Sequence, residues 1–180
     1  METWEWIVVG TAAALVLLLV LALVRIRKRR LHLQERFGPE YHRAVSSSGT
    51  GAAEKRLGEV ERERSKLDIR PLPPAARERY LDEWRQAEAR FVSDPRESAR
   101  AAERIVERVL EERGYPVDDD AERRAAVVAV DHADIADRYR HGRAMLSSVD
   151  GAEGTENLRK AIVDFRSVLE ELLESDTKAA

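Results

Sequence analysis

Cysteine is absent from this chain of 180 residues, and that absence excludes several classes of site. Without thiols there is no disulfide, no iron–sulfur cluster, no zinc knuckle and no thiol nucleophile. The sequence also lacks a glycine-rich phosphate loop, a Gly-x-Ser-x-Gly elbow and a His-Glu-x-x-His zinc motif. We therefore predict no cofactor, and the sequence disfavours an enzyme.

Charge is nearly balanced overall, with 31 basic and 34 acidic residues, but it is unevenly distributed. Residues 25–43 carry seven basic and two acidic side chains, whereas residues 93–180 carry 14 basic and 21 acidic ones. A basic segment suits an anionic membrane surface, and an acidic domain is repelled by nucleic acid. We expect a membrane partner and no nucleic acid.

One long apolar run stands near the N-terminus. Residues 6–24 contain no charge and are rich in leucine, valine and alanine. As a helix rising about 1.5 Å per residue, such a run crosses roughly 30 Å of hydrocarbon. A cleaved signal peptide is the alternative, but Glu2 and Glu5 precede the run and a basic cluster follows it directly. We predict a retained transmembrane helix over residues 6–26.

The basic cluster also predicts the orientation of this helix, because lysine and arginine beside a membrane helix stay on the cytoplasmic side. The N-terminus is then outside and the C-terminal body is cytoplasmic, with the chain a single-pass protein of the plasma membrane. The same cluster is expected to bind anionic lipid headgroups through Arg25, Arg27, Lys28, Arg29 and Arg30.

Two segments connect the anchor to the body. Residues 27–51 are a basic juxtamembrane segment in which Gly38-Pro39 ends the helix, and the Ser/Gly/Thr run at 46–51 predicts a flexible linker. Residues 52–70 form a charged connecting helix with a short apolar seam. It is either a solvated spacer or a weak coiled coil that self-associates.

The body over residues 72–175 has the pattern of an all-α, four- to five-helix up-and-down bundle. Asp94-Pro95 predicts a helix start, Gly114 predicts a left-handed helix stop, and Asp131 and Thr155 are expected to cap the last two helices. The clearest apolar stripe belongs to the last helix and consists of Leu158, Ala161, Ile162, Phe165, Val168, Leu169 and Leu172.

One cluster has the residue types of a metal site. Asp134, Asp137 and His141 share one face of a predicted helix, and two carboxylates with an imidazole suit a divalent ion. Three basic residues surround that face and favour exposed ion pairs instead: Arg138, Arg140 and Arg143. We therefore predict a solvated face without a metal.

Two other groups have a structural and a functional interpretation. His132 falls on the apolar side of the same helix, which indicates packing or capping more than a catalytic base. Tyr80, Trp84 and Arg85 could form a binding surface if exposed, but the helical pattern places Trp84 in the core and Arg85 in solvent.

Six short motifs follow the apolar run in a fixed order. They are Glu35–Tyr41, Ile69–Leu72, Arg79–Trp84, Phe91–Pro95, Glu112–Pro116 and Thr155–Arg159. In this order the chain resembles a set of small single-pass membrane proteins of high-GC, actinobacterial-type bacteria. The resemblance covers nearly the whole chain and implies no activity.

These features favour a membrane-anchored helical interaction module, an adaptor or scaffold with an unknown protein partner. A protein of envelope stress or cell-wall maintenance is an alternative that requires the opposite orientation or a cleaved anchor. A metal-dependent enzyme using Asp134, Asp137 and His141 is the other alternative.

Overall fold

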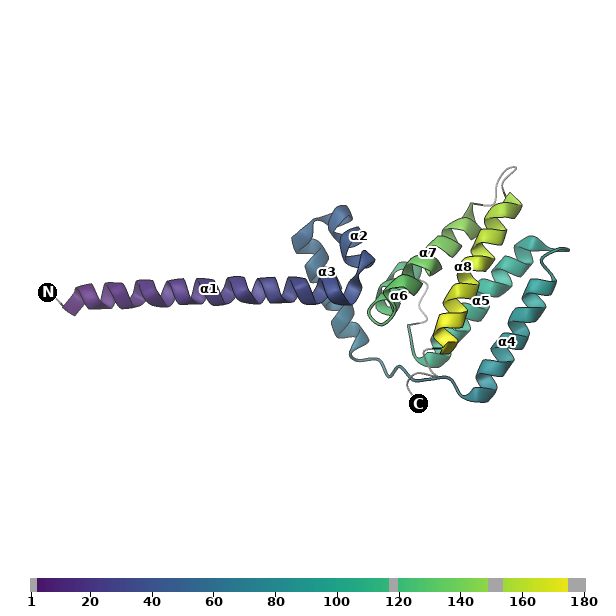
Figure 1. Ribbon diagram of the computed structural model, residues 1–180, viewed down its shortest axis with the longest axis horizontal. Coiled ribbons are helices and arrows are strands. Elements are labelled where there is room, and N and C mark those ends of the chain that lie inside the picture. Colours follow the sequence, from purple (N-terminus) through teal and green to yellow (C-terminus); the bar gives the residue numbers. More distant parts are fainter. Residues whose placement is uncertain (1–2, 117–119, 149–153, 175–180) are drawn as a thin grey trace. The chain divides into compact units, whose positions relative to one another are not determined.

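The computed structural model describes residues 3–116, 120–148 and 154–174, with side chains from residue 10 onward. These residues form eight helices and no β-strand, which confirms the all-α prediction (Figure 1). The chain divides into two compact units, Met1–Glu54 and Lys55–Ala180, whose boundary falls within helix α3.

Helix α1 spans Thr3–Phe37 and begins the first unit. Its side chains from residue 10 to residue 32 are exposed, and it is long and apolar enough to cross a membrane. A signal sequence near an N-terminus can meet the same criterion of length and hydropathy. The helix ends where Gly38 takes a left-handed φ of 46° and Pro39 follows, as predicted.

Helix α2, Pro39–Ser48, packs against the end of α1. The two helices bury Leu33, Phe37, Tyr41 and Ala44. Glu54, in the first turns of α3, joins this group because its Oε1 accepts hydrogen bonds from Arg30 Nε at 2.9 Å and from the Tyr41 hydroxyl at 3.2 Å. The juxtamembrane segment is thus a folded helical hairpin.

The prediction of a flexible linker at residues 46–51 is wrong. Helix α2 continues to Ser48, and α3, Thr50–Arg64, begins after Gly49 alone. The three serine hydroxyls donate to carbonyl oxygens of the preceding turn, so they are satisfied inside the helix. Gly49 then stops the helix with φ 78° while its N–H donates to the Val45 carbonyl.

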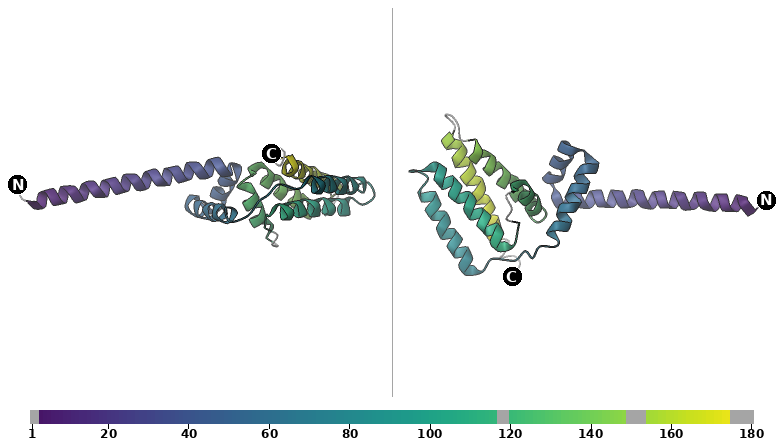
Figure 2. Two further views of the ribbon diagram at one scale, coloured as in Figure 1. Left: turned by 90° about the horizontal axis from the view of Figure 1, so that it is seen from below. Right: turned by 180° about the vertical axis from the view of Figure 1, so that it is seen from behind.

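The second unit is a bundle in which α8 packs against α5 and α7, α4 packs on α5, and α6 packs on α7 (Figure 2). The chain reverses direction between α4 and α5 and between α7 and α8 (Figure 1). The five helices are α4 Pro74–Ala89, α5 Pro95–Arg113, α6 Ala121–Ala129, α7 Ala133–Ser147 and α8 Gly154–Glu174.

Capping residues and a glycine define several ends of the bundle helices. The Asp94 carboxylate accepts a hydrogen bond from the Glu97 amide at 3.0 Å, and Gly114 ends α5 with φ 96°, both as predicted. The predicted cap at Asp131 is wrong, because His132 takes the N-cap position of α7. Thr155 lies inside α8, which begins at Gly154.

The core of the bundle follows the predicted apolar stripes. All seven residues of the stripe on the last helix are buried. Trp84 is 4% exposed, which confirms its place in the core, while Arg85 lies at the surface beside Asp82. The two aromatic residues of α4, Tyr80 and Trp84, therefore pack the bundle and form no binding surface.

Two buried arginines join the helices through polar contacts. Arg124 of α6 donates to the Pro116 carbonyl at 2.9 Å, to Glu107 at 2.8 Å and to the Tyr139 hydroxyl at 3.0 Å. The Arg113 guanidinium donates to the Leu172 carbonyl in the last turn of α8. These contacts fix α5 against α6, α7 and the end of α8, because a buried charge must keep its partners.

The connecting helix ends earlier than predicted, since α3 stops at Arg64 and residues 68–73 are not helical. Leu57 and Val60, which belong to its apolar seam, are buried within the chain. Ion pairs hold the last turn of α3 to the bundle: Glu63 contacts Arg123, and Arg64 contacts Asp131.

Candidate functional site

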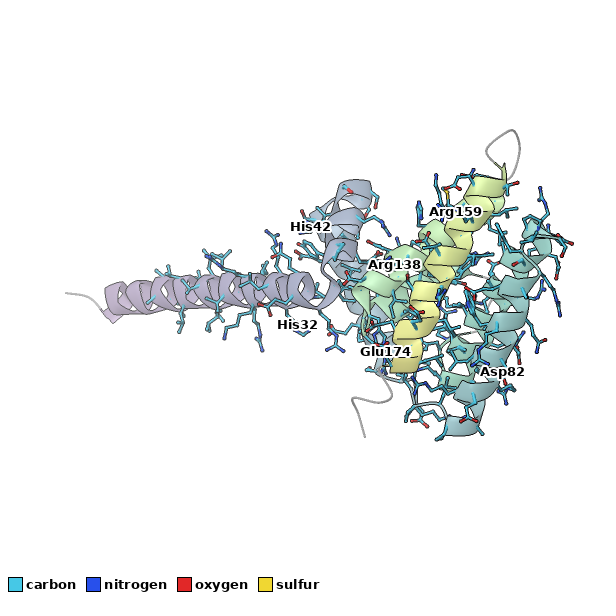
Figure 3. The ribbon with its side chains drawn as sticks, turned by 45° about the vertical axis from the view of Figure 1, so that its right-hand side comes forward. His32, His42, Asp82, Arg138, Arg159 and Glu174 are labelled. Carbon is cyan, nitrogen blue, oxygen red and sulfur yellow. The ribbon has the colours of Figure 1, made fainter. Side chains whose placement is uncertain are left out.

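A groove of about 500 Å³ lies where α7 begins and α8 ends. Figure 3 labels Arg138 on α7 and Glu174 at the end of α8, which belong to its two walls. Half of the residues that line the groove are acidic, and it is open to solvent. Its charged and polar lining consists of Asp131, His132, Asp134, Arg138, Ser167, Glu170, Glu171 and Glu174.

Local geometry places these carboxylates together. The chain leaves α6 at Val130 and enters α7 at Ala133, so Asp131 and His132 occupy a tight turn. The His132 amide closes this turn by donating a hydrogen bond to the Val128 carbonyl at 2.9 Å. On α8, Glu170, Glu171 and Glu174 fall on the side opposite its apolar stripe, because residues three and four apart share a helix face.

The groove keeps an excess of negative charge. Asp131 is held by Arg64 and by the Tyr115 hydroxyl at 3.0 Å, and Glu170 pairs with Arg166 at 2.8 Å. In the described part of the chain, Asp134, Glu171 and Glu174 have no ion-pair partner within 4.0 Å. Burial and the neighbouring Asp131 carboxylate raise the pKa of Tyr115, so its hydroxyl remains a hydrogen-bond donor near neutral pH.

His132 is a half-buried side chain that lines this groove. Its ring makes no capping hydrogen bond to α7. Burial first, and the positive charge of Arg113 second, lower the pKa of His132, against the opposing effect of Asp131 and Glu171. The ring is therefore neutral at pH 7 and adds no positive charge to the groove.

This lowered pKa predicts a loss of stability in mild acid. Below about pH 6.5 the unfolded chain protonates His132 while the folded chain resists, so the free energy of unfolding falls until the folded ring also takes a proton. Above that pH, His132 is neutral in both the folded and the unfolded chain, so it no longer makes the free energy of unfolding depend on pH. Urea titrations at about pH 7.5 and about pH 5.5 should show a smaller loss for His132→Gln than for the wild type. Equal losses would contradict the prediction.

The three candidate metal ligands do not converge. Asp134 lines the groove, Asp137 pairs with Arg140 at 3.5 Å, and His141 Nδ1 lies 2.5 Å from Asp164 Oδ2 on α8. Among the described residues, no group of three or more histidine or acidic side chains is placed to hold a metal ion.

The three arginines around the candidate metal ligands differ in their ion-pair partners. Arg140 also pairs with Glu122 at 2.8 Å, and Arg143 reaches Glu103 at 2.9 Å. Arg138 instead lines the groove, where it is the one arginine or lysine among the described lining residues.

Comparison of the chain with known protein families, curated proteins and solved structures finds no match. Its function is therefore inferred from the anchor helix and the groove.

Sequence reasoning missed the α8 side of the groove. Glu170, Glu171 and Glu174 follow the clearest apolar stripe in the chain, and their spacing is that of an ordinary solvated helix face. The available signal was the concentration of acidic residues in the last turns of α8, where carboxylates are unfavourable beside the negative end of the helix dipole.

Proposed function

We propose that the chain is a single-pass membrane protein whose cytoplasmic bundle docks a basic segment of a partner protein in the acidic groove. The observation that carries this proposal is the groove itself, an open hollow lined by three carboxylates that have no ion-pair partner among the described residues. A volume of about 500 Å³ lies in the range of small binding sites and fits a few side chains of a docked segment.

The chemistry of the groove supports a ligand with lysine or arginine side chains. Asp134 on one wall and Glu171 and Glu174 on the other are placed to receive cations from a segment lying between α7 and α8. Charge complementarity of this kind raises association rates and selects partners, and it weakens with added salt. An adaptor needs such selective, reversible docking.

The anchor supports the membrane part of the proposal. The apolar side chains of α1 from residue 10 onward are exposed over a length that could cross a membrane, and so large an exposed apolar surface is typical of a contact with a membrane or a partner. The basic cluster that follows is exposed as well, and although Arg30 pairs with Glu54, Arg25, Arg27 and Lys28 carry the charge expected of a segment that meets anionic headgroups. By the positive-inside rule the bundle is cytoplasmic.

Site-directed photo-crosslinking in cells tests the docking. A crosslinking amino acid at Ser167, inside the groove, should give a defined adduct, whereas the same group at Asp82 on α4 should not. Asp134→Lys combined with Glu171→Lys and Glu174→Lys should lower the Ser167 adduct by more than about tenfold, because like charges would face the partner.

A matched variant controls for net charge. Three exposed carboxylates outside the groove, Glu78, Asp82 and Glu111, can be reversed to lysine together, and the Ser167 adduct should persist. An adduct that is absent, or that both triple variants reduce equally, would refute docking in the groove.

Orientation has its own test. The full chain fused at its C-terminus to green fluorescent protein should fluoresce in a bacterial host, and the same chain fused to alkaline phosphatase should be inactive. Phosphatase activity without fluorescence would place the bundle outside the cytoplasm. It would make a function in the cell envelope the better proposal.

A further inference from the structure

The corner between α4 and α5 combines exposed apolar side chains with unpaired arginines. Val92, in the turn, is 94% exposed, and Val163 of α8 is 49% exposed. Half-buried Phe91 and buried Ile162 line a shallow hollow of about 210 Å³ beside this corner, together with Val163, Glu88 and Arg159. Single exposed apolar residues are ordinary, but a group gathered at one corner indicates a contact surface.

Three arginines lie within eight residues of Val92 in the sequence. Arg90 ends α4, and Arg96 and Arg100 lie in the first turns of α5, all of them exposed. Within the part of the chain that the structure describes, none of the three has an ion-pair partner within 4.0 Å. Most other arginines of α4 and α5 do, such as Arg104 with Glu97.

The nearby carboxylates are already engaged. Glu88 pairs with Arg166 at 3.2 Å, Glu97 pairs with Arg104, and Asp94 accepts the Glu97 amide hydrogen bond at the start of α5. The three arginines therefore keep their charge available for an anionic surface, although the bundle as a whole is acidic.

We propose that this corner is a second membrane contact, with which the bundle rests on the anionic surface of the bilayer that carries α1. Exposed apolar side chains bordered by arginines are the composition of surfaces that lie in the headgroup region of a membrane. The anchor keeps the bundle close to that bilayer, so docking is effectively intramolecular and needs little intrinsic affinity. Anionic lipid attracts each arginine, and the apolar side chains enter the boundary of the acyl chains.

The absence of cysteine allows a direct test on the full chain. Val92→Cys provides a single site for an environment-sensitive fluorophore at the corner. Ala75→Cys, exposed in the first turn of α4, provides the matched control at the end of that helix remote from Val92. Each labelled protein is reconstituted into phosphatidylcholine vesicles with or without phosphatidylglycerol, and a lipid-borne quencher reports contact with the bilayer.

We expect a blue-shifted, strongly quenched signal from position 92 in the anionic vesicles, a weak one in neutral vesicles, and none from position 75. Each arginine near an anionic surface favours binding by about fivefold. Replacing Arg90, Arg96 and Arg100 together by glutamine should thus lower the docked-to-free ratio about a hundredfold. Replacing the same three by lysine should preserve it, and high salt should weaken it.

Three results would overturn the proposal. The first is a fluorophore at position 92 that stays in water in anionic vesicles. The second is equal quenching at positions 92 and 75. The third is quenching only when the anionic lipid is supplied in separate vesicles, because the bound surface would then not be the protein's own bilayer. Circular dichroism of the glutamine and lysine variants verifies that both keep the wild-type helix content.

Discussion

Replacing Leu15 and Leu18 by arginine is expected to release the chain from the membrane. Both side chains lie near the middle of the apolar run and are 68% and 62% exposed. An arginine at the centre of a membrane helix costs about 2.5–3.5 kcal/mol, so the pair should abolish insertion. Cell fractionation with carbonate extraction should find the wild type in the membrane pellet and the double variant outside it.

Leu31→Arg is the matched control for this experiment. It introduces the same side chain on the same helix, at a position beyond the apolar run that is also exposed. This variant should remain in the pellet. A double variant that stays in the pellet would contradict a spanning α1, and a C-terminal fragment shorter than the full chain would indicate a cleaved leader.

Phe165→Ala is expected to remove much of the stability of the bundle. Phe165 is fully buried on α8, and its ring centroid lies 6.3 Å from that of Tyr139 on α7. Truncating such a residue typically costs about 3–5 kcal/mol, a large part of the stability of a small domain. Urea unfolding of the full chain in mild detergent, followed by circular dichroism, should show the loss. Val163→Ala, half-exposed on the same helix, should change stability by less than about 0.5 kcal/mol.

The contact between Phe165 and Gly142 makes this prediction sharper. A Cβ built on Gly142 would lie 3.0 Å from the Phe165 ring, so α7 approaches α8 closely at this glycine. Gly142→Ala should therefore be unfavourable in the wild type and neutral or favourable beside Phe165→Ala, since alanine has the better helix propensity. Additive effects of the two substitutions would contradict the close contact.

Much of the fold could be predicted because its signals are local. Asp94-Pro95 and Gly114 fix the two ends of α5 through one capping carboxylate and one left-handed residue. The stripe from Leu158 to Leu172 fixes the buried face of α8. These features depend on the residues of a single helix, and the structure has them where the sequence indicates.

The rest depended on contacts between distant segments. Asp131 has the residue type of a helix cap, but it is held by Tyr115 and Arg64, which are remote in sequence. The serines at 46–48 have the composition of a linker, yet backbone carbonyls one turn earlier accept their hydroxyls. The groove could not be predicted because it forms only when the polar face of α8 meets the first turn of α7.

The segment between α3 and α4, residues 65–73, contains two prolines and is not helical, so its composition is that of a site for proteases. Yet the Arg70 amide donates to the Arg113 carbonyl at 3.0 Å, and Leu72 is buried. The Asp68 carbonyl oxygen also lies so close to Gly114 that a Cβ on residue 114 would be only 2.5 Å from it. Cleavage requires a segment to leave its contacts and enter the protease. The Arg70 amide should accordingly exchange its hydrogen slowly, and limited proteolysis should spare this segment and cut first at the exposed turn around Val92.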